Sequence, residues 1–486
     1  MKENKIHSVK YNFIMNFILT ASQFLFPLIT FPYISRVLQP AGNGKIAFVS
    51  SIANYFMLVA SLGIPTYGIR ACAQVRNDRR KLSQTVKEIF LINFAMTICV
   101  IVIYMVSVFC VPKFYAEKEL FLVYGINILL NMFGMNWVFQ ALEQYDYITF
   151  RSILFKIIAI VLMFLFVHQY DDYVVYGAIT VFAAVGSNIL NFIRLRKYID
   201  FKTIQKYHIK KHVVPILVLF AQSLVISVYT NLDTVMLGFI KTDTDVGYYN
   251  VAVKIKVILL SLVTSLGNVL LPRMSYYIKQ NMVEDFKKTM LKALNFTALL
   301  AIPLVFYFVM YSKESICFLA GEGYAGAVFA MQLITIAIIP SGITGVLGLQ
   351  VLTSLEKEKY VLYSVIVGAV VDFLLNMCFI PSYGAAGAAG ATMVAEFVVL
   401  FVQIYYTRDL LCQMVKKIRI HIYLFLAVMG GILSYFVKCL RFNSYFLILA
   451  ISAIVFFGIY GIGLILFKEE NIMQMIYELR KKLNKK

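Results

Sequence analysis

The sequence contains little charge. Asp, Glu, Lys and Arg make up only 14% of its 486 residues, whereas soluble domains carry about 25%. Hydrophobic residues reach 61%, well above the roughly 45–50% of a soluble domain. A soluble globular fold is therefore excluded, because one buried core cannot hold so many apolar side chains.

The sequence also lacks the motifs that carry catalysis or hold metals and nucleotides. It contains no G-x-S-x-G, no H-E-x-x-H and no Walker loop. Its seven cysteines form no C-x-x-C pair, so they indicate neither a disulfide framework nor a metal site. We therefore predict a protein that is not an enzyme, with no catalytic residue, no metal and no cofactor.

Long apolar runs recur along the whole chain. Runs of about 18 residues or more are typical of membrane spans, and helices satisfy their own backbone in lipid. We predict an all-α polytopic membrane protein with about fourteen transmembrane helices. The first run exceeds a signal-peptide core of about 7–15 residues, so we expect it to be retained. The predicted spans are 11–34, 46–64, 86–111, 120–141, 153–167, 174–193, 213–240, 248–271, 291–311, 325–351, 361–380, 385–406, 420–437 and 445–467.

The net charge of +20 is distributed asymmetrically between the predicted connections. Connections on one side of the membrane hold few basic residues, and those on the other side hold most of them. By the positive-inside rule the basic side is cytoplasmic, and so are both termini. The charge is thus a topology signal, and we do not expect a nucleic-acid partner. The basic clusters lie at residues 70–81, 194–211, 273–292, 408–419 and 480–486.

Two parts of the chain resemble each other. Gly44 opens the segment GKIAFVSSI and Gly247 opens GYYNVAVKI, and an arginine follows each glycine by 26 residues. Further matches, in the same order along the chain, join Ser61-Leu62-Gly63 to Ser265-Leu266-Gly267, Glu143 to Glu356, and Tyr147 to Tyr360.

The repeat predicts the organisation of the chain. Repeats with an even number of spans are parallel and related by an axis along the membrane normal. We predict two pseudo-symmetric six-helix bundles with a central cleft between them. The expected parts are an N-terminal bundle at 1–197, a cytoplasmic linker at 198–212, a C-terminal bundle at 213–410, and two additional helices with a basic cytoplasmic tail at 411–486.

Several charged residues lie inside predicted spans, where each costs at least about 2.5–3.5 kcal/mol at a helix centre. Asp233 and Lys254 lie at similar depth in adjacent antiparallel spans. They form either a structural ion pair or a contact for substrate at an outer gate. Lys156 lies about one turn from the cytoplasmic end of its span, and we expect it to reach the lipid interface.

A second group of charges lies near the middle of neighbouring spans. Asp372 and Glu396 are each about eleven residues into their helices. Two carboxylates at one depth can share or exchange a proton, since like charges raise one pKa. They are therefore candidates for ion coupling, although either could simply face water in a cavity. Lys256 is a further charge inside a span.

Arg70 and Arg273 are the arginines that the repeat relates. An arginine at a cytoplasmic helix end usually anchors topology. These two recur at the same spacing, however, and matching helices of paired bundles face a common cleft. Guanidinium groups bind phosphate in a bidentate manner. We expect Arg70 and Arg273 to contact an anionic substrate.

Two stretches resemble a known family. FPYISRVLQPAGNGKIAFVSSIANYFMLVASLGIPTYGIR (Phe31–Arg70) is similar to the N-terminal signature of bacterial oligosaccharide flippases, the Wzx-type polysaccharide-transporter family. NLDTVMLGFIKTDTDVGYYNVAVKI (Asn231–Ile255) resembles that family's seventh and eighth helices. The family belongs to a superfamily with lipid II flippases and multidrug exporters. The resemblance covers essentially the whole chain.

The resemblance implies a function. Such a protein moves an undecaprenyl-pyrophosphate-linked oligosaccharide from the inner to the outer leaflet of the bacterial cytoplasmic membrane, for O-antigen or capsule. Cationic residues of a central cavity hold the pyrophosphate; the matching positions are Arg70, Arg273 and the deeper Lys254. Membrane lipid, a polysaccharide polymerase and a chain-length regulator are the expected partners. The alternatives are a multidrug or cation exporter and a membrane polysaccharide polymerase, though the latter needs a large outer loop.

Overall fold

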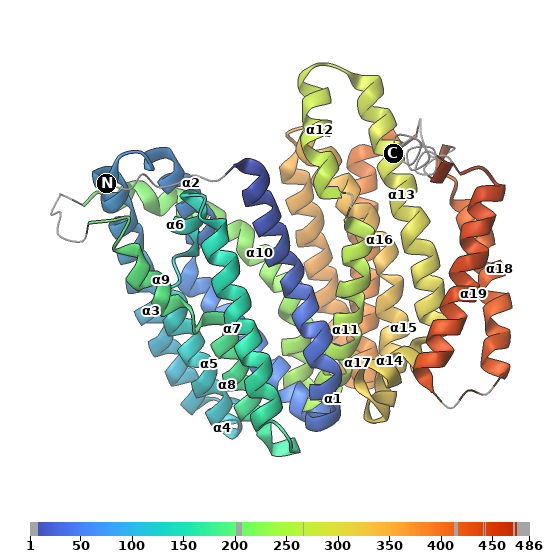
Figure 1. Ribbon diagram of the computed structural model, residues 1–486, viewed down its shortest axis with the longest axis horizontal. Coiled ribbons are helices and arrows are strands. Elements are labelled where there is room, and N and C mark those ends of the chain that lie inside the picture. The colour runs from blue at the N-terminus through green and yellow to red at the C-terminus, as the bar shows by residue number, and fades with distance from the viewer. Residues whose placement is uncertain are drawn as a thin grey trace, which may run out of the picture. The chain divides into compact units, whose positions relative to one another are not determined.

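A computed structural model gives the fold of the chain. It describes residues 8–200, 207–265, 267–412, 417–440, 442, 444–469 and 472–473. These residues form helices and turns, with no strand among them, so the predicted all-α fold is confirmed (Figure 1). Part of the predicted linker, 201–206, and the basic tail from 474 onward lie outside the described residues.

Along the chain the helical elements occur in this order: α1 (Val9–Ser61), α2 (Ile64–Val75), α3 (Arg79–Cys110), α4 (Pro112–Ala116), α5 (Lys118–Asn131), α6 (Asn136–Ala141), α7 (Tyr145–Phe166), η1 (Tyr170–Asp172), α8 (Tyr173–Val185), α9 (Asn188–Leu195), α10 (Lys210–Ile240), α11 (Asp243–Thr264), α12 (Gly267–Lys279), α13 (Val283–Met310), α14 (Ser312–Ala320), η2 (Glu322–Ala327), α15 (Val328–Ile336), α16 (Ile338–Thr344), η3 (Gly345–Leu352), α17 (Glu358–Leu411), α18 (Ile420–Cys439) and α19 (Tyr445–Leu466).

Twelve helical segments of the described chain are long and apolar enough to cross a bilayer. Two of them have double length, 66 residues for Lys10–Val75 and 54 for Glu358–Leu411, while about 20 residues suffice for one crossing. Each bends sharply at one non-helical residue, Gln39 (φ 57°) in α1 and Gly384 (φ 52°) in α17. With each counted as two passes, the segments give the fourteen helices that the sequence predicts.

Polar residues end the apolar helices on the side predicted to be cytoplasmic. Asp78 caps α3, because its Oδ1 accepts hydrogen bonds from the backbone amides of Arg80 and Lys81 at 3.0 and 3.1 Å. These amide hydrogen bonds, the one from Lys81 first, hold the pKa of Asp78 below its usual value. Acidic residues also open α13, where Glu284 and Asp285 lie in the first turn and complement the helix dipole.

The chain divides into two compact units, Met1–Gly247 and Tyr248–Lys486. In the first, α1 packs against α3, α5, α7 and α10, and α2 packs against α3, α6 and α10. In the second, α13 and α17 pack with α15 and α16, and α18 pairs with α19 beside α13. Helix α10 thus belongs to the first compact unit, and the predicted division at 198–212 stays a prediction.

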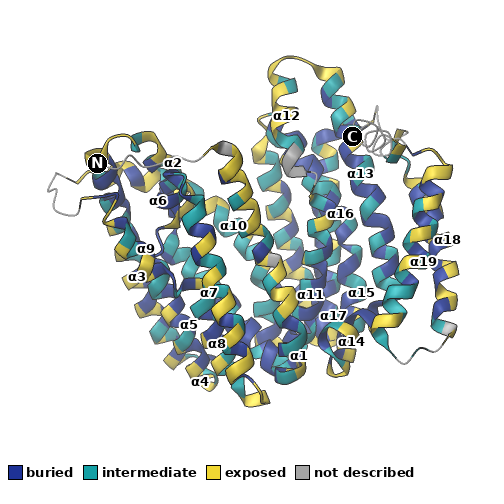
Figure 2. Cartoon of the chain, in the orientation of Figure 1, coloured by how far each residue is buried: buried dark blue, intermediate teal, exposed yellow. Residues whose placement is uncertain are grey.

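Apolar side chains cover much of the surface. Figure 2 shows exposed residues along α3, α7, α18 and α19, and many of them are large and hydrophobic. Phe150 is 73% exposed, Ile454 73% and Leu466 76%. A contiguous apolar surface of this kind belongs in lipid. The chain is therefore a multi-pass membrane protein.

The backbone repeats at positions that the sequence relates. Glu143 and Glu356 both have positive φ, 56° and 57°. The amide of Glu143 donates to Gln140 O at 3.0 Å, and that of Glu356 donates to Thr353 O at 3.0 Å. One residue later the amides of residues 144 and 357 reach back five residues, both at 2.9 Å. The same helix-ending turn, a Schellman-type turn, thus occurs in both halves.

Candidate functional site

A break in the helical path separates α1 from α2. Leu62 has φ 48°, Gly63 precedes the first helical residue, and Pro65 lies in the first turn of α2, where a missing amide proton is tolerated. A Cβ on Gly63 would lie 2.4 Å from the carbonyl oxygen of Ile216 in α10. Glycine is required here because the backbone of α10 passes directly against the break.

Helix α2 presents Arg70 on its exposed side. The opposite side is fixed by Tyr67 and Gly68, both buried. A Cβ on Gly68 would lie 2.4 Å from the Trp137 ring of α6, so only glycine allows this contact. The Arg70 guanidinium carbon lies 5.8 Å from the centroid of the Tyr67 ring, within the range of a cation–π contact.

The second half contains a matching arrangement. Helix α11 ends at Thr264, just before the second Ser-Leu-Gly, and α12 begins at Gly267; Leu266 lies outside the described residues. Arg273 is exposed, and its Nε donates to the Tyr277 hydroxyl at 2.6 Å. Each arginine follows the first residue of its short helix by six positions. Both therefore occupy the same register in repeat-related helices.

The remaining predicted substrate residues lie on α10 and α11. Asp233 is 4% exposed, in the first compact unit, and Lys254 is half-buried, in the second. The two residues belong to different units, and their pairing stays a prediction. So does the common cleft for Arg70 and Arg273.

The two candidate coupling carboxylates are in different surroundings. Asp372 is 1% exposed on α17, with Asn376 one turn later and fully buried. Glu396, farther along α17, forms an ion pair with Lys256 of α11 at 3.2 Å, and both side chains are about nine-tenths buried. Glu396 therefore has a counter-ion that the sequence did not reveal. Proton sharing between Asp372 and Glu396 stays a prediction.

The first unit contains a buried ionic network that the sequence analysis did not predict. Glu88 of α3 is fully buried. Its Oε2 lies 2.8 Å from His212 Nε2 and 2.9 Å from Lys211 Nζ, and its Oε1 accepts from the His208 backbone amide at 2.8 Å. His212 lies just before the predicted span 213–240 and is 3% exposed in the first turn of α10. The sequence signal for this network was Glu88 itself, an acidic residue within the predicted span 86–111.

The predicted position of Lys156 is also corrected. Helix α7 begins at Tyr145, not near 153, so Lys156 lies in the middle of the helix. Its Nζ donates to Ser22 Oγ of α1 at 2.9 Å and lies 5.3 Å from the Phe26 ring. It lines a cavity of about 330 Å³ between α1, α7 and α8. A polar partner inside the unit, not the lipid interface, accommodates the charge.

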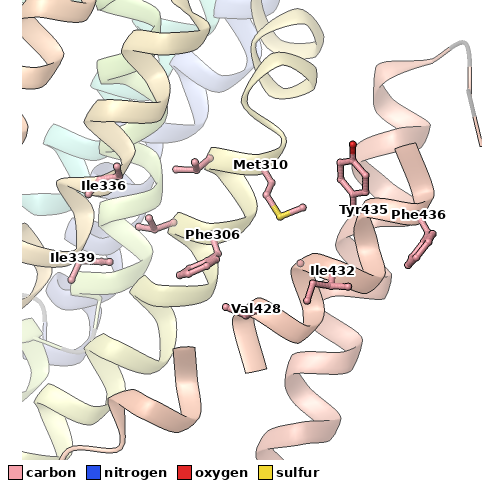
Figure 3. A pocket seen from close by; sticks show the side chains of 11 residues that line it. Phe306, Met310, Ile336, Ile339, Val428, Ile432, Tyr435 and Phe436 are labelled. Atoms are coloured by element: carbon pink, nitrogen blue, oxygen red, sulfur yellow. The ribbon is translucent and has the colours of Figure 1, made fainter. Parts of the chain in front are cut away.

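A larger cavity of about 700 Å³ lies in the second unit beside α18 (Figure 3). Figure 3 shows Met310 and Phe306 of α13 on one side and Tyr435 and Ile432 of α18 on the other. Its wall is almost wholly apolar. At the end of α13, Tyr311 donates to Ser434 O at 2.6 Å, and Lys438 pairs with Glu314 at 3.0 Å. These bonds tie α18 to the bundle and leave the apolar cavity between them.

No group of three or more His, Cys, Asp or Glu side chains that could hold a metal ion occurs within the described ranges. The arrangement consists of cations at helix breaks, buried ion pairs inside helical bundles and an apolar cavity. Such features suit binding and movement of an amphiphilic anion rather than bond-making chemistry.

The fold is that of multi-pass membrane transporters. A family model described as "Polysaccharide biosynthesis protein" matches residues 9–280, more than half of the chain, and the chain therefore belongs to that family. A second model, described as MatE, matches residues 219–378.

Individual proteins agree with this assignment. The chain is 23% identical over 413 residues to a provisionally named O-antigen transporter of Escherichia coli (strain K12), covering 84% of this chain and 99% of that one. A lipid II flippase, MurJ, in an inward closed conformation aligns with TM-score 0.75 and 14% identity over 95% of this chain and all of that one. An inward-facing MATE-family multidrug transporter aligns with TM-score 0.61 and 11% identity, over 80% and 98%. The comparisons confirm the resemblance to polysaccharide transporters and agree with the prediction of a protein that is not an enzyme.

Proposed function

We propose that the protein is a flippase that moves undecaprenyl-pyrophosphate-linked oligosaccharide from the inner to the outer leaflet of the bacterial cytoplasmic membrane. The product would feed synthesis of a surface polysaccharide such as O-antigen or capsule. One observation carries the proposal: Arg70 and Arg273 each lie six residues after the first residue of a short helix, and each helix begins at or directly after the glycine of a Ser-Leu-Gly sequence. Membership of the polysaccharide biosynthesis family supports it.

The pyrophosphate would be held by the two arginines. A guanidinium group stays charged at every physiological pH and can form two parallel hydrogen bonds to phosphate oxygens. Arg70 and Arg273 are both exposed in their units, so neither guanidinium group is part of a buried ion pair. The half-buried Lys254 would offer a further cation deeper in the path, and Asp233 would contact the sugar or repel the anion after transfer.

The movement would be alternating access between parallel repeats. Secondary transporters with internal repeats place the substrate at the repeat interface and rock one repeat against the other. The Ser-Leu-Gly breaks and the shared turns at Glu143 and Glu356 support such repeats. Asp372 and Glu396 would couple the cycle to an ion or proton gradient, with Lys256 as the counter-ion of Glu396.

The polyprenyl tail would remain in an apolar environment throughout. The cavity of about 700 Å³ between α13 and α18 is large enough for part of such a chain and is lined by apolar side chains. It lies beside α18, one of the two additional C-terminal helices, and these helices would flank a lateral opening for the tail. Both termini would be cytoplasmic, and a polymerase and a chain-length regulator would act on the product.

A multidrug or cation exporter is the second candidate. The MatE match over 219–378 and the MATE-like fold favour it. An exporter of cations would bind through carboxylates and aromatic rings, and loss of the arginines would not impair it. The two functions are therefore separated by their dependence on Arg70 and Arg273.

The test is complementation of a flippase-null strain whose glycan the protein accepts, with Arg70→Ala, Arg273→Ala and the double variant. We expect partial loss of surface glycan in each single variant and loss by at least about 100-fold in the double, since each charged hydrogen-bonded contact contributes about 1.5–3 kcal/mol. Arg80→Ala, at the exposed start of α3, is the matched control. Full activity of the double variant at normal membrane abundance would contradict the proposal.

A further inference from the structure

A cation–π contact and two hydrogen bonds connect Arg70 to a buried carboxylate. Arg70 lies over the Tyr67 ring, with 5.8 Å between its guanidinium carbon and the ring centroid. The Tyr67 hydroxyl lies 2.6 Å from His212 Nδ1, and His212 Nε2 lies 2.8 Å from Glu88 Oε2. The chain thus runs from an exposed cation to a fully buried carboxylate through two buried rings.

The Glu88 acceptor fixes the direction of its bond to His212, and the direction of the bond to Tyr67 follows for the neutral imidazole. The Glu88 carboxylate already accepts from Lys211, from Gln84 and from the His208 amide, at 2.9, 2.9 and 2.8 Å. It acts as an acceptor toward His212 as well, so Nε2 of His212 carries the proton. In the neutral imidazole Nδ1 is then an acceptor, and the Tyr67 hydroxyl donates to it.

The bonds join two consecutive helices to a third that is far from them in sequence. Tyr67 comes from α2, Glu88 from α3, and His212 from the first turn of α10, directly after the basic connection between the predicted halves. The Tyr67 and His212 rings also meet edge to face, with 5.5 Å between centroids. A tyrosine held by both contacts cannot turn freely, so the ring beneath Arg70 has one orientation.

We propose that Tyr67 and His212, anchored by Glu88, are positioning residues that hold Arg70 in the orientation that binds the substrate's pyrophosphate. The inference rests on the proposed function and deepens it, because it assigns to the start of α10 a part in substrate binding. Neither ring touches the substrate. Tyr67 acts through Arg70, and His212 acts through Tyr67.

The test measures binding of undecaprenyl pyrophosphate to the purified full-length protein in detergent micelles, with undecaprenol as the uncharged reference. Tyr67→Phe keeps the ring and removes the donated hydrogen bond. We expect it to weaken binding of the pyrophosphate about three- to tenfold, the usual range for one hydrogen bond. Undecaprenol binding should not change. Tyr198→Phe is the matched control, because Tyr198 is a buried tyrosine of the same cluster that donates to Gln144 at 3.1 Å.

Two substitutions of His212 separate its two bonds. Asparagine places its amide oxygen near the position of Nδ1 and keeps an acceptor for Tyr67, while glutamine places its amide nitrogen near Nε2 and keeps a donor for Glu88. We expect His212→Gln to weaken binding as Tyr67→Phe does, and His212→Asn to weaken it less. A thermal melt of each variant accompanies the binding measurement.

A double-mutant cycle distinguishes positioning from a general structural role. In an Arg70→Ala background, Tyr67→Phe should leave pyrophosphate binding unchanged, because the residue it positions is absent. An equal loss in both backgrounds, or wild-type binding by Tyr67→Phe, overturns the inference. If instead the unaltered protein binds undecaprenol as tightly as undecaprenyl pyrophosphate, the proposed function itself fails.

Discussion

At the scale of single residues, charge inside the helical bundles is accompanied by close partners. Glu88 receives four donors from α3, α10 and the connection before α10. Glu396 has Lys256, and Lys156 has Ser22. A buried ion is tolerated only when hydrogen bonds and an opposite charge replace its lost hydration. Apart from Gln84, the partners come from other helices or connections, which explains why the charges were visible in the sequence while their pairing was not.

Glu88→Gln tests how strongly this network stabilises the first unit. The substitution keeps size and shape but places an amide N–H₂ against donors and leaves Lys211 without a counter-charge. We expect a loss of about 2–3 kcal/mol and a lower melting temperature in detergent. Glu119→Gln, at an exposed site in the first turn of α5, should change the melting temperature little. Equal melting of both variants would show that the network contributes nothing.

At the scale of elements, the breaks and kinks decide where the charged residues lie. The end of α1 at Ser61 and the start of α2 at Ile64 turn the chain so that Arg70 is exposed and Tyr67 is buried. Glycine permits this turn because α10 passes against Gly63 and Trp137 packs against Gly68. The sequence showed the Gly and Pro of the break, but the reason for each glycine is a contact with a distant helix.

Gly63→Ala tests that contact. The added methyl carbon would lie 2.4 Å from Ile216 O, which forces α10 away from the break. We expect a destabilisation of about 1–3 kcal/mol, typical of overpacking, and reduced complementation in the null strain. Gly458→Ala is the control: it lies in α19 with nothing within 4 Å of an added Cβ. It should stabilise by up to about 1 kcal/mol through helix propensity. A stable, active Gly63→Ala would refute the proposed close approach.

At the scale of the whole molecule, the apolar runs and the basic connections define how the chain lies in a membrane. Fourteen passes place residues 168–172, before α8, on the side opposite to the start of α3. The positive-inside bias predicts that the latter is cytoplasmic. The two compact units each contain their own buried clusters.

Cysteine labelling tests this topology. After replacement of the exposed native cysteines, Asp171→Cys should react with a membrane-impermeant maleimide in intact cells. Arg80→Cys, also at an exposed position, should react only after the membrane is permeabilised. The reverse pattern would invert the orientation and place the arginine-bearing helices on the outer side.

The fold was predictable to a large extent because membrane insertion depends on local composition. The number of passes, the all-α class and the repeat of Ser-Leu-Gly and Glu143 with Glu356 all follow from runs and spacings in the sequence. The predictions that were wrong concern contacts between segments that are distant in sequence. Lys156 was placed near a helix end because α7 extends by a turn or more beyond its apolar run.

The sequence by itself determined that the chain crosses a membrane many times and that Arg70 and Arg273 recur at the same spacing; the cytoplasmic orientation of the basic connections stays a prediction. These properties depend on hydropathy and periodicity, which are local. Only the tertiary structure decided that Glu396 pairs with Lys256 and that an apolar cavity lies between α13 and α18. It also decided that hydrogen bonds connect Glu88 through His212 to Tyr67, whose ring contacts Arg70. Such pairings depend on which helix faces meet, and that is set by packing of the whole chain.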